Sequence, residues 1–300
     1  MTEAPTTEAP TTGEPMRLAG APISWGVCEV PGWGYQLPPS RVLAEMRDVG
    51  LAAAEFGPDG FLPAAPADKT AVLARYGLTA VGGFMPVVLH DPAADPLPQI
   101  AGVLHDFIAA GAGVLVLAAA TGLDGYDARP ELDEGSWRTL LANLDAAAAM
   151  ATERGILATL HPHVGTMVER PDEVQRVLDG CAAALCLDSG HLLISGTDPA
   201  ELARQAPGRV AHAHLKDVDA GWAGRVCRGE VSYTEAVARG MYRPLGQGDV
   251  DVAGLVGALR EAGYAGWYVL EQDTILSGEP SGEGPVDDVR ASVAYLQGLS

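Results

Sequence analysis

The sequence is short of basic residues and of cysteine. Its 300 residues include 19 Lys and Arg against 39 Asp and Glu, so the formal net charge is −20 at pH 7. Nucleic-acid binding needs clustered basic side chains against the phosphates, and anionic membrane surfaces attract basic segments, so we expect neither partner. Four cysteines at irregular spacing are too few for a disulfide framework or a cysteine-rich zinc site.

Long apolar runs are also lacking. No stretch reaches the about 18 consecutive apolar residues of a membrane-spanning helix. No basic segment followed by an apolar one opens the chain, so we expect a cytoplasmic protein. Residues 1–15 are rich in Pro and Thr and have no large apolar residue after Met1. Such a segment buries too little surface to offset its ordering entropy, so we expect a disordered arm.

Residues 16–300 alternate short apolar runs with longer segments of helical spacing. The runs are apolar throughout, which is typical of strands covered on both faces of a parallel sheet. Eight strand–helix units predict a single-domain α/β protein with a (β/α)₈ TIM barrel, and a doubly wound open sheet is the alternative. We expect the strands at residues 18–25, 52–56, 78–85, 114–119, 156–161, 184–188, 210–215 and 267–272.

A long loop, residues 217–251, separates the seventh and eighth predicted strands. Long loops at the carboxyl face of a barrel are usually functional, so we expect this stretch to cover the active site. Arg243 within it is a candidate contact for a substrate oxygen, and a solvated arginine is the equal alternative.

Histidines and carboxylates gather where predicted strands end, which is where TIM barrels place their reactive groups. Five of the seven histidines fall at the ends of strands five, six and seven, and carboxylates end strands six and eight. Imidazole and carboxylate together suit a divalent cation. His212 and His214 point the same way along a strand, so periodicity does not choose between them as ligands.

Other strand-end side chains are candidates for substrate contact. We expect Trp25 and Glu55, at the ends of strands one and two, to line the pocket floor. His90 follows strand three. Lys216 either holds a substrate oxygen or pairs with Asp217. The candidate substrate-binding residues are Trp25, Glu55, His90, His212 and Arg243.

The strand-end strings resemble those of the xylose-isomerase-like sugar isomerases and epimerases. They are APISWG at 21–26, EFGPDGFLP at 55–63, LHPHVGT at 160–166, LCLDSGH at 185–191, HAHLKDV at 212–218 and VLEQD at 269–273. Within that family these strings, and EAVARGMYRPLGQG at 235–248, look most like the inosose dehydratases.

The resemblance implies a metal held by His161, Asp188, His214 and Glu271, with Mn²⁺ or Co²⁺ expected first and Zn²⁺, Fe²⁺ or Mg²⁺ also suited. Many members of the family have Glu at the strand-five position, where this chain has His161. That departure disfavours a two-glutamate epimerisation and favours dehydration. His163, two residues on, is an alternative strand-five ligand.

The resemblance therefore implies a metal-dependent lyase of inositol catabolism. It would dehydrate a keto-cyclitol such as 2-keto-myo-inositol through a metal-stabilised enolate. A sugar isomerase or epimerase on the same barrel is the alternative. Glu271 would be ligand and candidate base, His163 and His191 are acid candidates, and Lys216 would hold the enolate oxygen or a ring hydroxyl unless it pairs with Asp217. The expected partner is a small cyclitol or keto sugar, and a homo-oligomer is left open.

Overall fold

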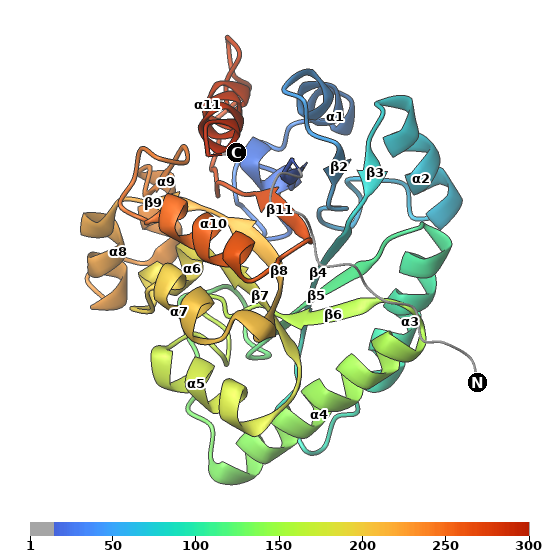
Figure 1. Cartoon of the computed structure of the whole chain (residues 1–300), viewed down its shortest axis with the longest axis vertical. Coiled ribbons are helices and arrows are strands. Elements are labelled where there is room, and N and C mark those ends of the chain that lie inside the picture. Colours follow the sequence, from blue (N-terminus) through green and yellow to red (C-terminus); the bar gives the residue numbers. More distant parts are fainter. Residues whose placement is uncertain (1–14, 300) are drawn as a thin grey trace.

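The computed structural model describes residues 15–299, so the predicted disordered arm lies outside the described residues except for its last position. Within these residues, nine parallel strands form one sheet that is rolled into a barrel and surrounded by helices (Figure 1). The predicted TIM barrel is confirmed. The strands are β1 (Arg17–Gly20), β2 (Ala53–Ala54), β3 (Thr79–Ala80), β4 (Gly82–Val87), β5 (Val114–Ala119), β6 (Leu157–Leu160), β7 (Ala184–Asp188), β8 (Val210–Leu215) and β11 (Trp267–Leu270).

The barrel closes at Val81, which lies between β3 and β4. The Val81 amide donates to the Ala54 carbonyl, and the Val81 carbonyl accepts from the Val114 amide, both at 3.0 Å. One predicted strand, residues 78–85, is therefore divided where it must pair with different neighbours on its two sides. Gly82 permits this approach, because a Cβ there would lie 1.7 Å from the Val114 carbonyl oxygen.

The helices wrap the outside of the barrel with one apolar face inward. In α1 (Pro39–Asp48) that face consists of Val42, Leu43 and Met46, which are fully buried. Proline occupies the first turn of several helices, where its missing N–H costs nothing. The other helices around the barrel are α2 (Pro66–Arg75), α3 (Leu97–Ala109), α4 (Glu134–Glu153), α5 (Pro171–Gly180), α6 (Ser189–Ile194), α7 (Pro199–Gln205), α10 (Val252–Glu261) and α11 (Val286–Gln297).

The first strand is shorter at its carboxyl end than the predicted strand at residues 18–25. β1 ends at Gly20, and residues Pro22–Trp25 form the 3-10 helix η1 instead. Proline has no N–H for the ladder and its φ suits a helical first turn, so Pro22 ends the strand. Because Trp25 lies in this helical turn and not in a strand, its side chain does not point where a strand would have placed it.

The long connection between β8 and β11 is folded. It contains β9 (Asp217–Val218), α8 (Ala220–Cys227), α9 (Tyr233–Ala238) and β10 (Tyr242–Arg243), and its helices lie at the left of the barrel in Figure 1. β10 pairs antiparallel with β9. The buried Asp217 carboxylate accepts from the amides of Gly246, Gly248 and Val250, which fixes the far end of the connection. Within residues 15–299, helices of the length and apolarity needed to cross a membrane are absent.

Candidate metal centre and active site

Four side chains predicted as metal ligands meet at the carboxyl ends of β6, β7, β8 and β11. The Nε2 atom of His161 lies 3.2 Å from Oδ2 of Asp188. The Nδ1 atom of His214 lies 3.2 Å from Oε2 of Glu271 and 3.8 Å from Oδ2 of Asp188. All four side chains are buried, so groups far apart in the sequence converge on one point.

The hydrogen-bonding state of these atoms fits a bound cation. Among the described residues, both ring nitrogens of His161, Oδ2 of Asp188 and Nδ1 of His214 are buried without a hydrogen-bond partner. Buried polar atoms in native proteins are rarely left unpaired, and each of these can donate an electron pair. Two imidazoles and two carboxylates are a donor set for a first-row divalent metal.

One carboxylate oxygen of Asp188 faces the candidate metal site, and the other accepts backbone hydrogen bonds. Its Oδ1 accepts from the amides of Gly190 and His191, both at 2.9 Å, and so caps α6. Burial raises the pKa of this carboxyl, but the nearby Lys216 and His161 outweigh burial and lower the pKa to about 2. Asp188 is therefore ionised and oriented, with Oδ2 left for a cation.

Lys216 lies between three carboxylates. Its Nζ is 2.7 Å from Oδ1 of Asp273, 3.0 Å from Oε2 of Glu271 and 3.4 Å from Oδ2 of Asp188. Burial opposes the charge on Lys216, but these carboxylates raise its pKa well above the ordinary value. The alternative pairing with Asp217 does not form in the described structure, because that carboxylate is bound to backbone amides.

His163 and His191 are both held neutral. The Nδ1 atom of His163 lies 2.6 Å from the carbonyl oxygen of Val164, so this nitrogen carries the proton and Nε2 is the basic one. His191 accepts at Nε2 from the Lys216 ammonium at 3.0 Å. Burial, and then the neighbouring cationic or imidazole groups, lower the pKa of both rings well below the usual range.

Most of these side chains open onto a cavity of about 450 Å³ at the mouth of the barrel. Of the predicted site residues, its wall includes Glu55, His161, His163, His214, Lys216 and Glu271. Pockets of this size take small organic ligands, with a few polar groups fixing their orientation.

The structure places the remaining predicted residues elsewhere. Within residues 15–299, the cavity wall does not include Trp25, His90, His212 or Arg243. Trp25 is fully buried, and its Nε1 donates to Glu45 of α1, because η1 turns the ring toward that helix. Arg243 is exposed on β10, 3.5 Å from Asp219. Asp188 and His191 are buried behind the wall.

Several side chains near the site had no predicted role. The hydroxyl of Tyr233, from α9, donates to Oδ2 of Asp273 and lies 2.9 Å from the hydroxyl of Tyr242. Tyr126 packs on His163, with ring centroids 4.7 Å apart. The EQD string placed Asp273 beside the site, but periodicity did not indicate where tyrosines from distant loops would arrive.

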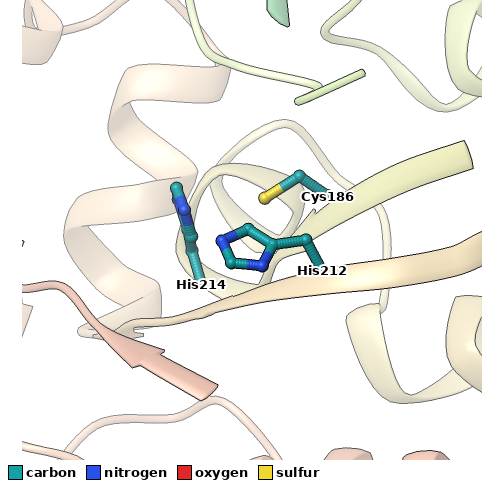
Figure 2. A group of neighbouring side chains, drawn as sticks. All are labelled: Cys186, His212 and His214. Carbon is teal, nitrogen blue, oxygen red and sulfur yellow. The ribbon is translucent and has the colours of Figure 1, made fainter. Parts of the chain in front are cut away.

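A second cluster borders His214 on its other side. Figure 2 shows the sulfur of Cys186 directed toward the rings of His212 and His214, and ligand atoms of the three residues lie within 4.8 Å of one another. Burial, the largest effect, raises the pKa of the Cys186 thiol to about 11. Asp188 and Glu271 lie beside Nδ1 of His214 and add two carboxylates, so the carboxylate side of His214 is the better site for a divalent cation such as Mn²⁺.

Comparison with known proteins agrees with the fold. Residues 43–298 match the family described as xylose isomerase-like TIM barrel. An inosose dehydratase from Geobacillus kaustophilus is 31% identical over 304 residues, which cover 96% of each chain. The rhizopine catabolism protein MocC of Rhizobium meliloti is 32% identical over 272 residues, covering 86% of this chain and 82% of that protein.

Solved structures share the same barrel at lower identity. The 3-keto-D-glucoside 4-epimerase YcjR from E. coli superposes with a TM-score of 0.66 at 17% identity, covering 94% of this chain and 99% of that one. An L-ribulose 3-epimerase gives a TM-score of 0.65 at 16% identity, covering 93% of both chains. With its fold, its strand-end site and the match over residues 43–298, the chain belongs to the family of xylose isomerase-like TIM barrels and is an enzyme of that family.

Proposed function

We propose that this protein is a metal-dependent hydro-lyase that removes water from a keto-cyclitol of the 2-keto-myo-inositol type. One observation carries the reaction type: the cavity wall presents a neutral imidazole, His163, and an ammonium, Lys216, beside the candidate ligands. The substrate class is supported by the inosose dehydratase that is 31% identical over 96% of this chain.

The proposed ligands are His161, Asp188, His214 and Glu271, with Mn²⁺ or Co²⁺ as the expected ion. A divalent cation held there would supply Lewis acidity at a substrate oxygen. The protein's own groups would transfer the protons.

His163 is the proposed base. Its Nδ1–H is engaged with the Val164 carbonyl, which leaves Nε2 free to take the proton α to the substrate carbonyl. This reverses the acid role expected for His163 from the sequence, because Nε2 carries no proton to give. Glu271 is less suited to this role, because its Oε2 already lies 3.0 Å from the Lys216 ammonium and 3.2 Å from Nδ1 of His214, and it is itself a proposed ligand.

Lys216 is the proposed acid. The carbon–hydrogen electron pair becomes the new double bond, the β carbon–oxygen bond breaks, and the departing hydroxide takes a proton from Nζ and leaves as water. The resulting enol tautomerises to a dione, and the proton on His163 returns to Lys216 through solvent. His191 lies behind the wall and accepts from Lys216, so it supports the acid and does not contact substrate.

Dissimilar groups favour elimination over epimerisation. An epimerase removes a proton from one face of a carbon and returns one to the other, which suits two like bases. Here strand five ends in His161 and His163 where a two-glutamate mechanism needs a carboxylate. The wall instead offers one free base and one charged acid, as loss of water requires.

The test is mass spectrometry of the product formed by the Mn²⁺-loaded protein from 2-keto-myo-inositol in heavy water. We expect a product lighter by one water, with His163→Gln retaining Mn²⁺ but forming no product. A product of unchanged connectivity with deuterium at carbon would establish an isomerase or epimerase and contradict the dehydration. If neither a product nor deuterium exchange is observed, the proposed substrate class is contradicted.

A further inference from the structure

Glu55 reaches across the barrel to the histidines of β8. It follows β2, which is separated from β8 in the sheet by β1 and β11. Its Oε1 accepts from Nε2 of His212 at 2.9 Å and from Nε2 of His214 at 3.0 Å. All three side chains are buried, with at most 3% of each exposed. The contact is therefore a desolvated, charge-assisted pair of hydrogen bonds.

This contact determines which nitrogen of His214 faces the metal centre. A neutral imidazole carries one N–H, and the hydrogen bond made by one nitrogen fixes which one is free to ligate. With Nε2–H held by Glu55, Nδ1 is the nitrogen that would bind a cation, which would displace any proton there, and it lies 3.2 Å from Glu271 and 3.8 Å from Asp188. Without Glu55, those two carboxylates would attract the N–H to Nδ1, where it would block a cation.

We propose that Glu55 is a positioning residue that sets the tautomer and ring orientation of His214 for metal binding, and that His212 steadies Glu55 by donating to the same oxygen. Outer partners of metal-bound histidines commonly act in this way. The proposal gives the two histidines of HAH different tasks, which strand periodicity could not separate. It also moves Glu55 and His212 from substrate contact to support of a ligand.

A direct ligand role for Glu55 is the rival. Its carboxylate forms a compact group with His214 and Glu271, whose ligand atoms lie within 4.8 Å of one another. The two roles differ in how they respond to an amide. The amide oxygen introduced by Glu55→Gln could still accept both N–H bonds and position His214, but it would be a much poorer ligand than a carboxylate.

The experiment measures Mn²⁺ dissociation constants from the free-ion EPR signal for the full chain and its variants. The inference rests on the metal site of the proposed function but not on its reaction, so turnover is not the readout. We expect Glu55→Ala to weaken Mn²⁺ binding by about 10–100-fold, the range for loss of an outer partner. The Mn²⁺ dissociation constant of Glu55→Gln should stay within a few-fold of the wild-type value. That of His212→Phe should lie between the values of Glu55→Gln and Glu55→Ala.

Asp188→Asn serves as the reference for loss of a ligand. If Glu55→Gln loses as much affinity as Asp188→Asn, Glu55 is a ligand and the proposal is overturned. Unchanged binding by Glu55→Ala also overturns it, and a wild type that binds no Mn²⁺ removes this inference and the proposed function together. Binding without dehydration contradicts only the proposed function.

A second measurement does not depend on whether Glu55→Ala folds. Ring ¹⁵N–¹H correlation spectra of the wild-type protein loaded with diamagnetic Zn²⁺ report the tautomer of each histidine. We expect His214 to carry its proton on Nε2. A proton on Nδ1 of His214 would overturn the proposal.

Discussion

The imidazole rings of His163 and His191 are stacked, with centroids 3.6 Å apart and planes inclined by 32°. One ring comes from the loop after β6 and the other from α6, so the contact joins two successive strand ends. Both rings are buried, and a charge on either would lie beside the other. The stack therefore favours two neutral imidazoles in the folded state, and the metal-free protein should reveal this through its stability.

Acidification below pH 6.5 should destabilise the metal-free protein. Burial is the main cause of lowered pKa values in His161, His163, His191 and His212, so below pH 6.5 the unfolded chain binds more protons than the folded one. Linkage then requires the free energy of unfolding to fall as pH falls. The raised pKa of His214 has the opposite effect only above pH 6.5.

The measurement is urea unfolding of EDTA-treated protein at pH 6.5 and pH 5.0. The free energy of unfolding should be lower at pH 5.0, and His191→Phe, which keeps a stacked ring but cannot take a proton, should reduce the difference. A free energy that is equal or higher at pH 5.0 would contradict the neutral state of the buried histidines.

Two substitutions at Asp188 should distinguish the roles of its two carboxylate oxygens. Asp188→Asn keeps Oδ1 as the acceptor that caps α6 but replaces the ligand oxygen, so the metal-free variant should fold and bind Mn²⁺ at least 100-fold more weakly, a loss greater than that of an outer partner. Asp188→Ala also removes the cap, which costs about 1 kcal/mol more. Calorimetric titration with Mn²⁺ and urea unfolding of the metal-free variants test this. Stoichiometric, tight Mn²⁺ in Asp188→Asn would remove Asp188 from the ligand set.

Much of the barrel could be predicted because local sequence and final position agree there. The strands at 114–119, 184–188 and 210–215 have the predicted bounds, since each is an apolar run ended by a polar group or a turn. The run at 78–85 is divided at Val81 by barrel closure, a constraint set by Ala54 and Val114 far away in the sequence. Periodicity carries no information about such partners.

The candidate site, like the barrel, could be predicted only in part. The convergence of His161, Asp188, His214 and Glu271 was predictable because it follows from where strands end, but the choice of these four as ligands came from the family resemblance. Tyr233 reaches Asp273 from the long connection, where no period relates position to direction. The roles of His163 and Glu55 depend on single hydrogen bonds, to the Val164 carbonyl and to His214, which only the folded chain brings into place.

Gly82 should be essential to barrel closure, whereas its neighbour should tolerate a methyl group. A Cβ at Gly82 would lie 1.7 Å from the backbone oxygen of Val114, so the β4–β5 pairing must shift. We expect Gly82→Ala to lose about 3 kcal/mol of stability, as in severe overpacking. At Gly83 the nearest atom would be 3.4 Å away, in the ring of Phe107, so Gly83→Ala should cost much less. Equal melting temperatures for the two variants would contradict this account of closure.

Tyr233→Phe should slow turnover without weakening metal binding. The Tyr233 hydroxyl donates to Oδ2 of Asp273, whose other oxygen holds the Lys216 ammonium at 2.7 Å. Loss of this donor leaves a buried carboxylate oxygen unsatisfied, and burial already raises the pKa of Asp273. Asp273 would then be protonated more readily and would hold the proposed acid less firmly. We expect kcat to fall about tenfold, the effect of roughly 1.4 kcal/mol, with little change in KM.

Tyr264→Phe is the matched control for this loss. Its hydroxyl donates to the Trp267 carbonyl at the start of β11, the end of the strand opposite Glu271, so the variant also loses one partly buried hydroxyl. It should lose stability of the same order, about 1 kcal/mol, and keep its kcat. Because both variants remove one oxygen from a packed tyrosine, a decrease in kcat confined to Tyr233→Phe would come from its link to Lys216. Equal kcat values would show that the tyrosine serves only to pack the long connection against the barrel.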